Sequence, residues 1–496
     1  MFFARPYWNL SAVKLAMSQI VGYKEREFDS EFGVRINYEG DGATTKVTPK
    51  SIFKIAKIAI AQMKILNERR KNSEFLKNDL LNKYFNYKSN YDDKKIEDIK
   101  KSWYELTHDD YLFSESTYFW QIFINTVHQS LYKDGLLKYV NEVDYLVLLS
   151  SIENISHLLP FYDMWDISRK IRNNEEAYSF WKENDVTTIV NKIDSKNSNY
   201  CFDDINKLIS EYGYHSDKEL DVAYECYYEN PTPFIISIKE MIDLSDEYSP
   251  EKDKENGKKE YEKILKELEN KVSKSTYKKI YKKIFNMRNM LWWREEFRDV
   301  STRFYYLIRI YTIKLAEKLK EESIISSIDD IWFLKVGNLW DYLDNKITKD
   351  DINNIINKNK NYYYAFKNYM SENEIGRVFS EVDEIESAKD EVITGLGANN
   401  GIVEGTARVI KDFSEIDRLK EKDILVTKFT DTGWTSKFAI LSGIVTEYGG
   451  ILCHAAIVSR EYGIPAIVSC HDAMKKIKDG QRIKIDGGKG TIEILN

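Results

Sequence analysis

The stretch TEYGGILCHAAIVSREYGIPAIVS, residues 446–469, predicts a strand end, a glycine turn, one short apolar helix, a glycine stop and a second strand. Two adjacent glycines permit a tight turn directly before the helix. Gly463 and Pro465 predict the end of the helix, because glycine favours the left-handed C-terminal conformation and proline cannot continue a helix. His454, one of only six histidines in the chain, opens this helix.

A histidine at this position lies beside unpaired backbone N–H groups and the positive end of the helix dipole. This environment attracts an anion such as phosphate and disfavours the imidazolium form of the ring. A neutral imidazole nitrogen can attack phosphorus and hold the phosphoryl group covalently. The alternative interpretation is a partly buried histidine that caps a turn.

The residues around His454 resemble the phosphohistidine swivelling domain of the phosphoenolpyruvate-utilising enzymes. The family pattern T-E-x-G-G-x-x-[SC]-H-A-A-I-V-x-R-E-x-G-I-P-A-[IV]-V is matched over residues 446–468. TDTGWTSKF at residues 430–438 resembles the family's T-D-P-G-W-T stretch, and the whole resemblance covers about residues 390–496. It implies that His454 is the phosphorylated residue. The residues that it implies near the phosphate are Gly449, Gly450, Cys453 and Arg460.

Three positions near the histidine qualify the resemblance. Cys453 is also compatible with a small packed thiol, and Arg460 with a surface ion pair to Glu461. Leu452 stands where the dikinases and phosphoenolpyruvate synthases carry a threonine that is used for regulatory phosphorylation. Because leucine cannot be phosphorylated, that control is not expected here.

The chain is predicted to be multidomain, with a large, mainly α-helical region at residues 1–385 and an α/β swivelling domain at residues 386–496. A charged linker, helical in its first part, is predicted around residues 371–397. Ser51 is a candidate N-cap for the first of four predicted helices. These helices cover residues 51–70, 145–165, 249–274 and 347–370.

The last hundred residues differ in texture, because short β-like runs alternate with turns there. Two helical pieces lie between the runs. The predicted strands cover residues 401–410, 423–429, 443–449, 465–469, 482–488 and 491–495.

Enzymes of this family charge the histidine with an ATP-grasp domain, and phosphoenolpyruvate synthases place a TIM barrel after the histidine domain. Residues 1–385 contain no G-x-x-x-x-G-K-[ST] loop, and the sequence ends at Asn496. We therefore expect ATP and Mg²⁺ to act through a partner ATP-grasp protein. A carrier fed by phosphoenolpyruvate is disfavoured. The order of helical region and histidine domain resembles the later part of rifampicin phosphotransferase and glutamine kinase.

The helical region carries weaker resemblances to the same proteins at residues 3–14, 211–231 and 291–309. In the last of these, Arg294 and Arg298 flank one edge of a predicted apolar face. Guanidinium groups suit phosphate or carboxylate recognition, so both are candidates for substrate binding. The alternative is a solvated flank, paired with nearby acidic residues. The predicted apolar face consists of Phe297, Val300, Phe304, Leu307, Ile308 and Tyr311, and the acidic residues are Glu295, Glu296 and Asp299.

His215 and Glu219 form an i, i+4 pair if this segment is helical, and Asp221 follows them. A histidine held by a carboxylate could act as a base on an acceptor hydroxyl or amide. The competing interpretation is a network that stabilises a loop. No metal site is predicted.

Composition excludes several classes of partner. With 73 basic and 80 acidic residues the chain is mildly acidic, which disfavours nonspecific nucleic-acid binding. No apolar run approaches the roughly 18 residues of a membrane span. The four cysteines show no C-x-x-C spacing, which favours free thiols and a cytoplasmic location.

Together these features predict a phosphotransferase, or one subunit of a split one. It would carry a phosphoryl group on His454 from an ATP-grasp partner to a small-molecule acceptor, swinging on the linker. The alternative is a noncatalytic or regulatory binding protein that retains the fold. An antibiotic hydroxyl, an amide nitrogen and a small metabolite all stay open as acceptors.

Overall fold

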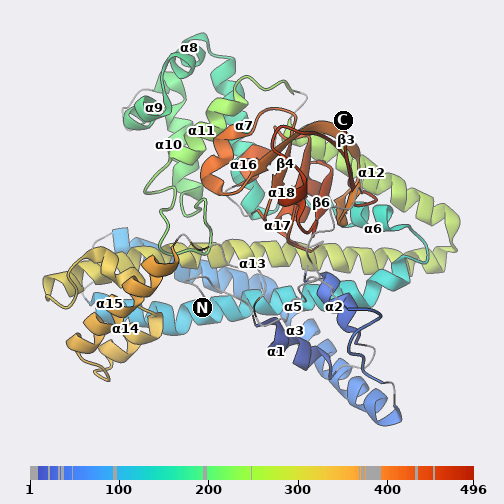
Figure 1. Cartoon of the computed structure of the whole chain (residues 1–496), viewed down its shortest axis with the longest axis horizontal. Helices are drawn as coiled ribbons and strands as arrows, with labels where there is room; N and C mark the ends of the chain where they lie inside the picture. Colours follow the sequence, from blue (N-terminus) through green and yellow to red (C-terminus); the bar gives the residue numbers. More distant parts are fainter. Residues whose placement is uncertain are drawn as a thin grey trace. The chain divides into compact units, whose positions relative to one another are not determined.

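The computed structural model describes residues 9–19, 23–31, 34, 38–46, 48–92, 98–193, 198–246, 249–367, 369, 375, 392–430, 434–438, 440–450 and 453–495. The chain divides into two compact units. Two long helices, α5 (Tyr111–Leu136) and α13 (Lys274–Glu321), contribute one part to each unit (Figure 1). The first unit contains Met1–Ser30, Ile36–Tyr118 and Val300–Glu386, and the second contains Glu31–Arg35, Phe119–Asp299 and Ser387–Asn496.

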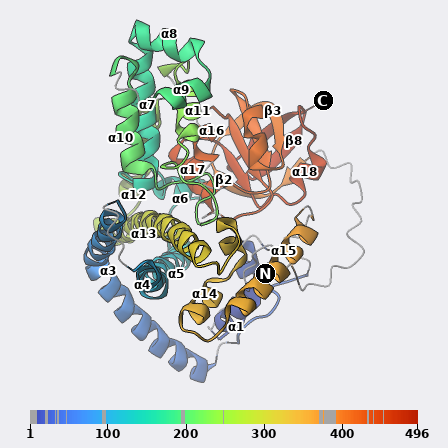
Figure 2. The same cartoon turned by 90° about the vertical axis from the view of Figure 1, so that its left-hand side faces the viewer.

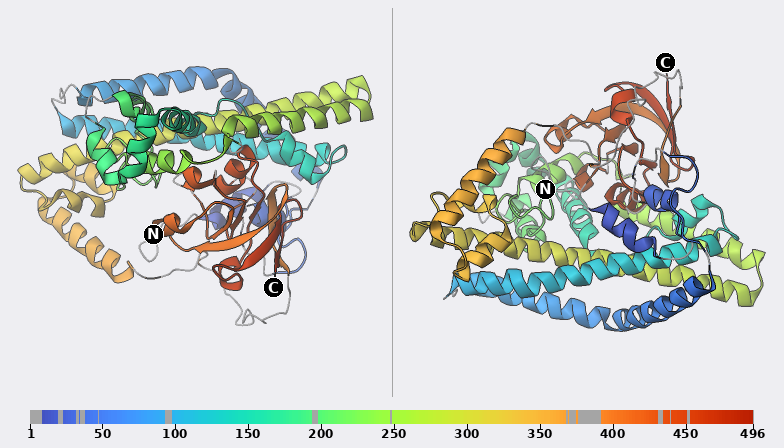
Figure 3. Two further views of the ribbon diagram at one scale, coloured as in Figure 1. Left: turned by 90° about the horizontal axis from the view of Figure 1, so that it is seen from above. Right: turned by 60° about the horizontal axis from the view of Figure 1, so that its bottom comes forward.

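The first unit is helical in its described residues. Its long helix α3 lies alongside the last part of α13 (Figure 3), where Tyr311 donates a hydrogen bond of 2.9 Å to the carbonyl of Tyr87. Trp103 donates to Thr312 at 2.8 Å, so the buried indole N–H is satisfied. Besides its parts of α5 and α13, the unit contains α1 (Leu10–Met17), α2 (Glu25–Glu31), α3 (Pro49–Asp92), α4 (Ile99–Glu105), a π-helix (Leu106–Asp110), a 3₁₀ helix (Ile328–Phe333), α14 (Val336–Leu343) and α15 (Lys349–Phe366).

Two predicted helices of this unit have outcomes in the structure. The helix predicted over residues 347–370 is α15, which Thr348 and Asp351 begin with a reciprocal capping box. The N-cap predicted at Ser51 is wrong, because α3 already begins at Pro49. Proline is well tolerated in a first helical turn, where its missing N–H costs nothing.

The second unit begins with a bundle of short helices in which α7 packs against α8, α10 and α11 (Figure 2). The side chain of Arg169 on α7 donates to the carbonyl of Leu244 at 2.7 Å, beyond the end of α11. The bounds are α6 (Glu142–Leu148), α7 (Leu159–Arg172), α8 (Glu175–Glu183), α9 (Val186–Lys192), α10 (Phe202–Tyr212), α11 (Thr232–Met241) and α12 (Pro250–Lys271), with 3₁₀ turns at Ser156–Leu158 and Ser198–Tyr200.

The single helix predicted over residues 145–165 is wrong in the middle. Helix α6 ends at Leu148, and α7 does not begin until Leu159. Between them Ser151 and Asn154 have positive φ angles of 52° and 57°, which no α-helix can contain. The helix predicted over residues 249–274 is confirmed as α12.

The C-terminal part of the second unit is an eight-stranded mixed sheet in the order β1-β8-β7-β3-β4-β5-β6-β2. Strands β3 to β6 pair in parallel, and the other pairings are antiparallel. The strands are β1 (Val392–Thr394), β2 (Leu396–Asn399), β3 (Ile402–Ile410), β4 (Asp423–Thr427), β5 (Gly443–Thr446), β6 (Ala466–Val468), β7 (Arg482–Asp486) and β8 (Thr491–Ile494).

The sheet curls on itself. Strands β1 and β2 occupy opposite ends of the strand order, although Gly395 alone separates them in the sequence. Two ends joined by one residue must lie close together, so the sheet closes toward a barrel. All six predicted strands are confirmed, whereas β1 and β2 were not predicted.

Alternating side chains along the strands enter two different cores. Ile424 and Val426 of β4 belong to a core inside the C-terminal domain, together with Ala473 of α18 (Ala473–Lys476). Leu425, between them, belongs to a second core that continues into α7 and α11 through Phe161 and other buried residues. The C-terminal domain and the helical bundle of this unit are therefore joined by shared apolar packing.

The predicted fold class, a large helical region followed by an α/β domain, is confirmed. The predicted boundary at residue 386 stays a prediction. Most of the predicted linker, and residues 3–8 of the N-terminal resemblance, lie outside the described residues.

Candidate functional site

The histidine singled out in the sequence is the first residue of α17 (His454–Glu461). Cys453 is the N-cap residue with extended backbone, and its N–H donates to the carbonyl of Gly450 at 3.0 Å. At the other end, Gly463 adopts φ +65° and Ile464 donates to the carbonyl of Ser459 at 2.9 Å, which confirms the predicted glycine stop.

The turn before the helix requires glycine at position 449. Gly449 has a φ of +120°, which side chains rarely adopt. A Cβ atom at this position would lie 2.7 Å from the Sγ of Cys453. The turn therefore holds the backbone against the N-cap residue and fixes where the helix begins.

His454 is half-buried and has partners on its own domain. Its Nδ1 lies 3.0 Å from the Oγ1 of Thr430, and its ring lies 5.9 Å from that of Phe438. Burial lowers the pKa of His454 well below its ordinary value, and the positive charge of Arg298 lowers it further. Arg298 and His157 lie in the helical part of the same unit.

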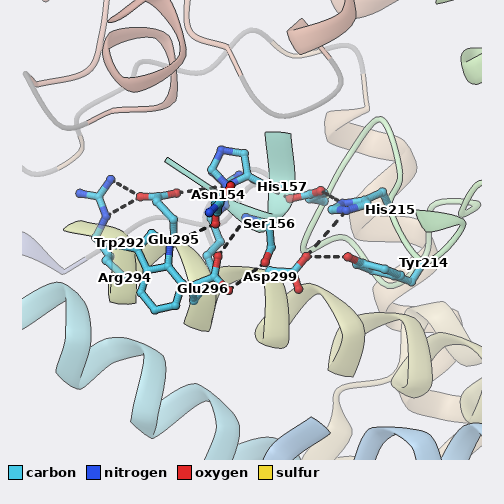
Figure 4. Close-up of polar contacts among 12 residues, drawn as sticks. Asn154, Ser156, His157, Tyr214, His215, Trp292, Arg294, Glu295, Glu296 and Asp299 are labelled. Carbon is cyan, nitrogen blue, oxygen red and sulfur yellow. Dashed lines mark hydrogen bonds and ion pairs between the residues drawn. The ribbon is translucent and has the colours of Figure 1, made fainter. Parts of the chain in front are cut away.

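Those side chains belong to a buried polar cluster on α13 and the segments that cover it (Figure 4). Arg294 donates from Nε and Nη2 to one oxygen of Glu295, at 2.7 and 2.5 Å. The other oxygen of Glu295 lies 3.5 Å from Nδ1 of His157. Burial opposes ionisation of Glu295, but Arg294, His157 and Arg298 outweigh it and lower its pKa to about 2.

A second row of the same composition lies beside the first. Arg298 approaches one oxygen of Glu219 at 3.4 Å, and the other oxygen lies 2.5 Å from Nδ1 of His215. On its far side, His215 presents Nε2 to Asp299 at 3.9 Å, and Asp299 accepts a hydrogen bond of 2.6 Å from Tyr214 (Figure 4). Burial opposes ionisation of Glu219, but His215 and Arg298 lower its pKa to about 2.

The segment that carries His157 is fastened along α13. Trp292 donates from its indole to the carbonyl of Asn154 at 3.0 Å. Glu296 accepts from the backbone N–H and the hydroxyl of Ser156, at 2.9 and 2.8 Å. These contacts place His157 at the cluster although its segment has no regular structure before the 3₁₀ turn (Figure 4).

Further contacts hold the C-terminal domain against the bundle near this cluster. Lys437 of α16 (Thr435–Phe438) pairs with Glu240 of α11, although its own side chain is only 4% exposed. The rings of Phe161 and Tyr462 lie 4.6 Å apart.

The predicted site residues divide between the site and other places. Gly449, Gly450 and Cys453 surround the start of α17, where burial raises the pKa of the Cys453 thiol. Arg460 lies in the last turn of α17, and its Nε donates to the carbonyl of Ala398 in β2 at 2.8 Å. The surface position weighed for Arg460 is wrong, because Arg460 is only 8% exposed, whereas its pairing with Glu461 stays a prediction, because the side chain of Glu461 lies outside the part that the structure describes.

Of the predicted substrate-binding residues, His215, Glu219, Arg294 and Arg298 come together in the cluster. His215 and Glu219 were expected to pair on a helix, but the segment after Gly213 consists of turns. Asp221 is not part of the cluster, because it is exposed and accepts from the N–H of Ala223.

The alternative interpretation, in which the arginines form a solvated flank, is wrong, because these charges are buried. Arg294 is 7% exposed and the acidic residues are more deeply buried still, while the predicted apolar face is confirmed. The acidic residues in question, 1–3% exposed, are Glu295, Glu296 and Asp299.

His157 was missed by the sequence reasoning. It lies in an apolar stretch that resembles an ordinary buried helix, and its partner Glu295 is remote in the sequence. The signal that could have found it is the polar run SSIEN at residues 150–154, which breaks the helix and frees the following histidine from helical packing.

Two negative findings apply to the described residues. In that part of the chain, no group of three or more His, Cys, Asp or Glu side chains is arranged to hold a metal ion. No helix among the same residues is both long and apolar enough to cross a membrane.

Two protein-family models match parts of this chain that contain residues of the site. Residues 419–490 match the mobile domain of PEP-utilising enzymes, and residues 118–295 match the rifampicin phosphotransferase fourth domain. Both matches agree with the resemblance found in the sequence.

Individual relatives agree with this assignment. The rifampicin phosphotransferase of Bacillus cereus is 32% identical over 340 residues, which are 66% of this chain and 39% of that protein. That of Bacillus subtilis is 32% identical over 301 residues, which are 59% of this chain and 34% of that protein. The probable phosphoenolpyruvate synthase of Pyrococcus horikoshii is 46% identical over 112 residues, 23% of this chain and 14% of that protein. The chain thus spans well under half the length of these relatives.

Proposed function

We propose that this chain, with its mobile domain and its rifampicin phosphotransferase fourth domain, is a phosphotransferase or one subunit of a split one. His454 receives a phosphoryl group from a nucleotide-binding ATP-grasp protein and passes it to a small-molecule acceptor at the buried cluster. The observation that carries the proposal is the position of His454, the first residue of α17, with its Nδ1 3.0 Å from the Oγ1 of Thr430.

The ring of His454 is suited to attack phosphorus. Its lowered pKa leaves it neutral at neutral pH, so one nitrogen offers a lone pair. If Thr430 accepts the proton on Nδ1, the lone pair resides on Nε2, which becomes the phosphorylated atom. The N–H groups at the start of α17 and the turn at Gly449 then steady the phosphoryl charge.

ATP and Mg²⁺ enter through the donor protein rather than through this chain. Mg²⁺ neutralises the nucleotide phosphates during transfer to the histidine. This chain supplies the nucleophile, His454, and the positive field at the N-terminus of α17. The predicted linker would let the C-terminal domain move between donor and acceptor positions, which replaces a diffusive step by proximity.

The acceptor end is the cluster on α13. Arg294 and Arg298 supply positive charge, His215 is hydrogen-bonded to Glu219, and Nδ1 of His157 lies 3.5 Å from Glu295. Such a pair can take a proton from an attacking hydroxyl. Rifampicin is the first acceptor to test, because it is named in two relatives that are each 32% identical to this chain over 340 and 301 residues.

The rival proposal is a noncatalytic binding protein that keeps the same fold. A fold alone does not need a half-buried neutral histidine at the first position of a helix, which favours the phosphotransferase.

The test is intact-mass analysis of the chain after incubation with Mg-ATP, alone and with a candidate ATP-grasp protein. The proposal expects an acid-labile gain of one phosphate that His454→Ala abolishes. His471→Ala is the matched control, because it removes another histidine of the same domain. Loss of the gain in both variants, or no gain with any donor, would favour the binding protein.

A further inference from the structure

We propose that the beginning of α13 is a docking surface for another protein, which presents an acidic, amphipathic helix to it. This surface has no role in the phosphotransfer proposed above, so the two proposals can fail independently. Its members lie on one exposed side of α13, and we call them the lysine–aromatic surface. They are Lys274, Lys278, Tyr281, Lys282 and Phe285.

Positive charge is concentrated in this part of the sequence. From Lys271 to Arg294 the chain has eight basic residues and no acidic one. The whole chain carries 73 basic and 80 acidic residues. The local excess is therefore not a consequence of a basic composition.

The side of α13 that faces its neighbours in this segment is apolar. Ile280 and Ile284, 4% and 0% exposed, belong to a core that also contains Leu268 of α12. At about 100° per residue, the lysine–aromatic surface lies on the side turned away from this core. Packing of the fold therefore leaves these side chains available to a partner.

The exposed side combines charge with aromatic rings. Lys274, Lys278 and Lys282 are exposed and follow one another at every fourth residue, about one helical turn apart. Tyr281 and Phe285 have the same spacing and are 43% and 58% exposed. A row of positive charges thus runs along the helix beside a pair of rings.

This arrangement opposes the stability of the helix. Like charges four residues apart repel each other, and Lys274, the first residue of α13, also meets the positive end of the helix dipole. Within the described part of the chain, none of the three lysines of the surface forms an ion pair. In contrast, Lys259 on α12 pairs with Glu255 at 2.8 Å. A charge pattern that the fold itself disfavours indicates an anionic partner.

The chemistry of the surface favours an acidic protein over a nucleic acid or an anionic membrane. Lysine attracts anions as a point charge, whereas bidentate recognition of phosphate is typical of arginine, which is absent from residues 274–285. Exposed aromatic rings are enriched at protein interfaces. A helix with carboxylates and apolar side chains at the same spacing would pair its charges with the lysines and its apolar side chains with the rings.

The experiment measures binding of the full chain to three probes. The first is a helical peptide in which glutamate and leucine each recur at every fourth residue. The others are an oligothymidylate and phosphatidylserine vesicles. We expect the peptide to bind most tightly, with an affinity that falls as the salt concentration rises.

The combined variant Lys274→Gln, Lys278→Gln and Lys282→Gln should weaken peptide binding about tenfold, because three exposed charge pairs are lost. Its thermal unfolding midpoint should rise, because repulsion within the helix is removed. These opposite effects distinguish a docking surface from a set of lysines that stabilises the fold.

A matched charge control comes from the other end of the same helix. Lys314 and Lys318 pair with Glu317 and Glu321 at 3.2 and 3.6 Å. Replacing these two lysines and Lys320 by glutamine removes the same charge. It should leave peptide binding unchanged and should not raise the unfolding midpoint.

The aromatic part of the surface is tested separately. Phe285→Ala should weaken peptide binding about tenfold at every salt concentration, because it removes apolar contact and no charge. Phe85→Ala is the control, because Phe85 on α3 is 56% exposed, close to the 58% of Phe285.

Four outcomes would overturn the proposal. The first is no binding of the peptide, and the second is tighter binding of the oligothymidylate or the vesicles. The third is an equal loss of peptide binding in the two combined lysine variants. The fourth is a lowered unfolding midpoint when the lysines of the surface are replaced, because they would then serve the fold.

Discussion

Thr430 Oγ1 lies 3.0 Å from Nδ1 of His454, which joins the loop after β4 to the first residue of α17. A ring nitrogen that shares a proton with a hydroxyl leaves the opposite nitrogen to do chemistry. The contact therefore bears on which atom of His454 carries a phosphoryl group, and not only on how the ring is held.

Replacing Thr430 by valine should slow phosphorylation of His454 without unfolding the domain. A side-chain hydrogen bond contributes about 1 kcal/mol, so the loading rate should fall about fivefold to tenfold. Thr430→Ser keeps the hydroxyl and should load at nearly the original rate. The measurement is the rate of mass gain with phosphoramidate, and equal rates for Thr430→Val and the unaltered chain would contradict the role of the contact.

Alanine at position 449 should displace the start of α17. The added Cβ would meet the sulfur of Cys453 at 2.7 Å on a backbone with φ +120°, a strain of about 1–3 kcal/mol. Loading of His454 should therefore fall at least tenfold. Gly480→Ala is the control, because Gly480 also has a positive φ, +84°, but open space around its Cβ position. Equal loading of Gly449→Ala and Gly480→Ala would contradict this prediction, because it would show that the contact of the added Cβ with Cys453 is tolerated.

The ion pair between Lys437 and Glu240 should hold the carrier histidine at the cluster. Lys437→Glu sets two carboxylates against each other at this contact of the C-terminal domain and the bundle. We expect His454 to react faster with phosphoramidate and the loaded chain to release phosphate more slowly, each by about tenfold, the effect of about 1.4 kcal/mol. Adding Glu240→Lys should restore both rates. If the double variant behaves like Lys437→Glu alone, the ion pair does not hold His454 at the cluster.

The C-terminal domain could be predicted from sequence because its signals are local. Runs of β-branched residues between glycines give strands such as β5, and the Gly-Gly turn, the histidine and Gly463 mark both ends of α17. Strands β1 and β2, of three and four residues, were not predicted. Their conformation depends on pairing with β8 and β6, which no local pattern encodes.

The site could be predicted only in part, for a related reason. The helical pattern of α13 gave its apolar face correctly, but periodicity does not tell whether a second segment covers the polar edge. That covering segment is residues 150–157, so Arg294 and Glu295 are buried rather than solvated. His157 is identified as a candidate only through its contact with Glu295. Because the two segments lie far apart in the chain, the spacing of residues in the sequence does not predict this contact.

Acid should destabilise the folded chain in a window set by its buried histidines. The folded pKa of His157 is about 4 against an ordinary 6.5, so between these values the unfolded chain binds a proton that the folded chain does not. Stability is therefore present above pH 6.5 and is lost as the pH falls toward 4, by about 3 kcal/mol in full. Glu219 and Glu295 do not contribute in this window, because carboxyl groups with lowered pKa lose their stabilisation only below their ordinary value of 4.5. His454 shares the depression, so thermal unfolding midpoints between pH 8 and 5 should fall less in His157→Gln and in His454→Gln, and least in the double variant. An unchanged slope in the double variant would mean that these rings are already charged in the folded protein.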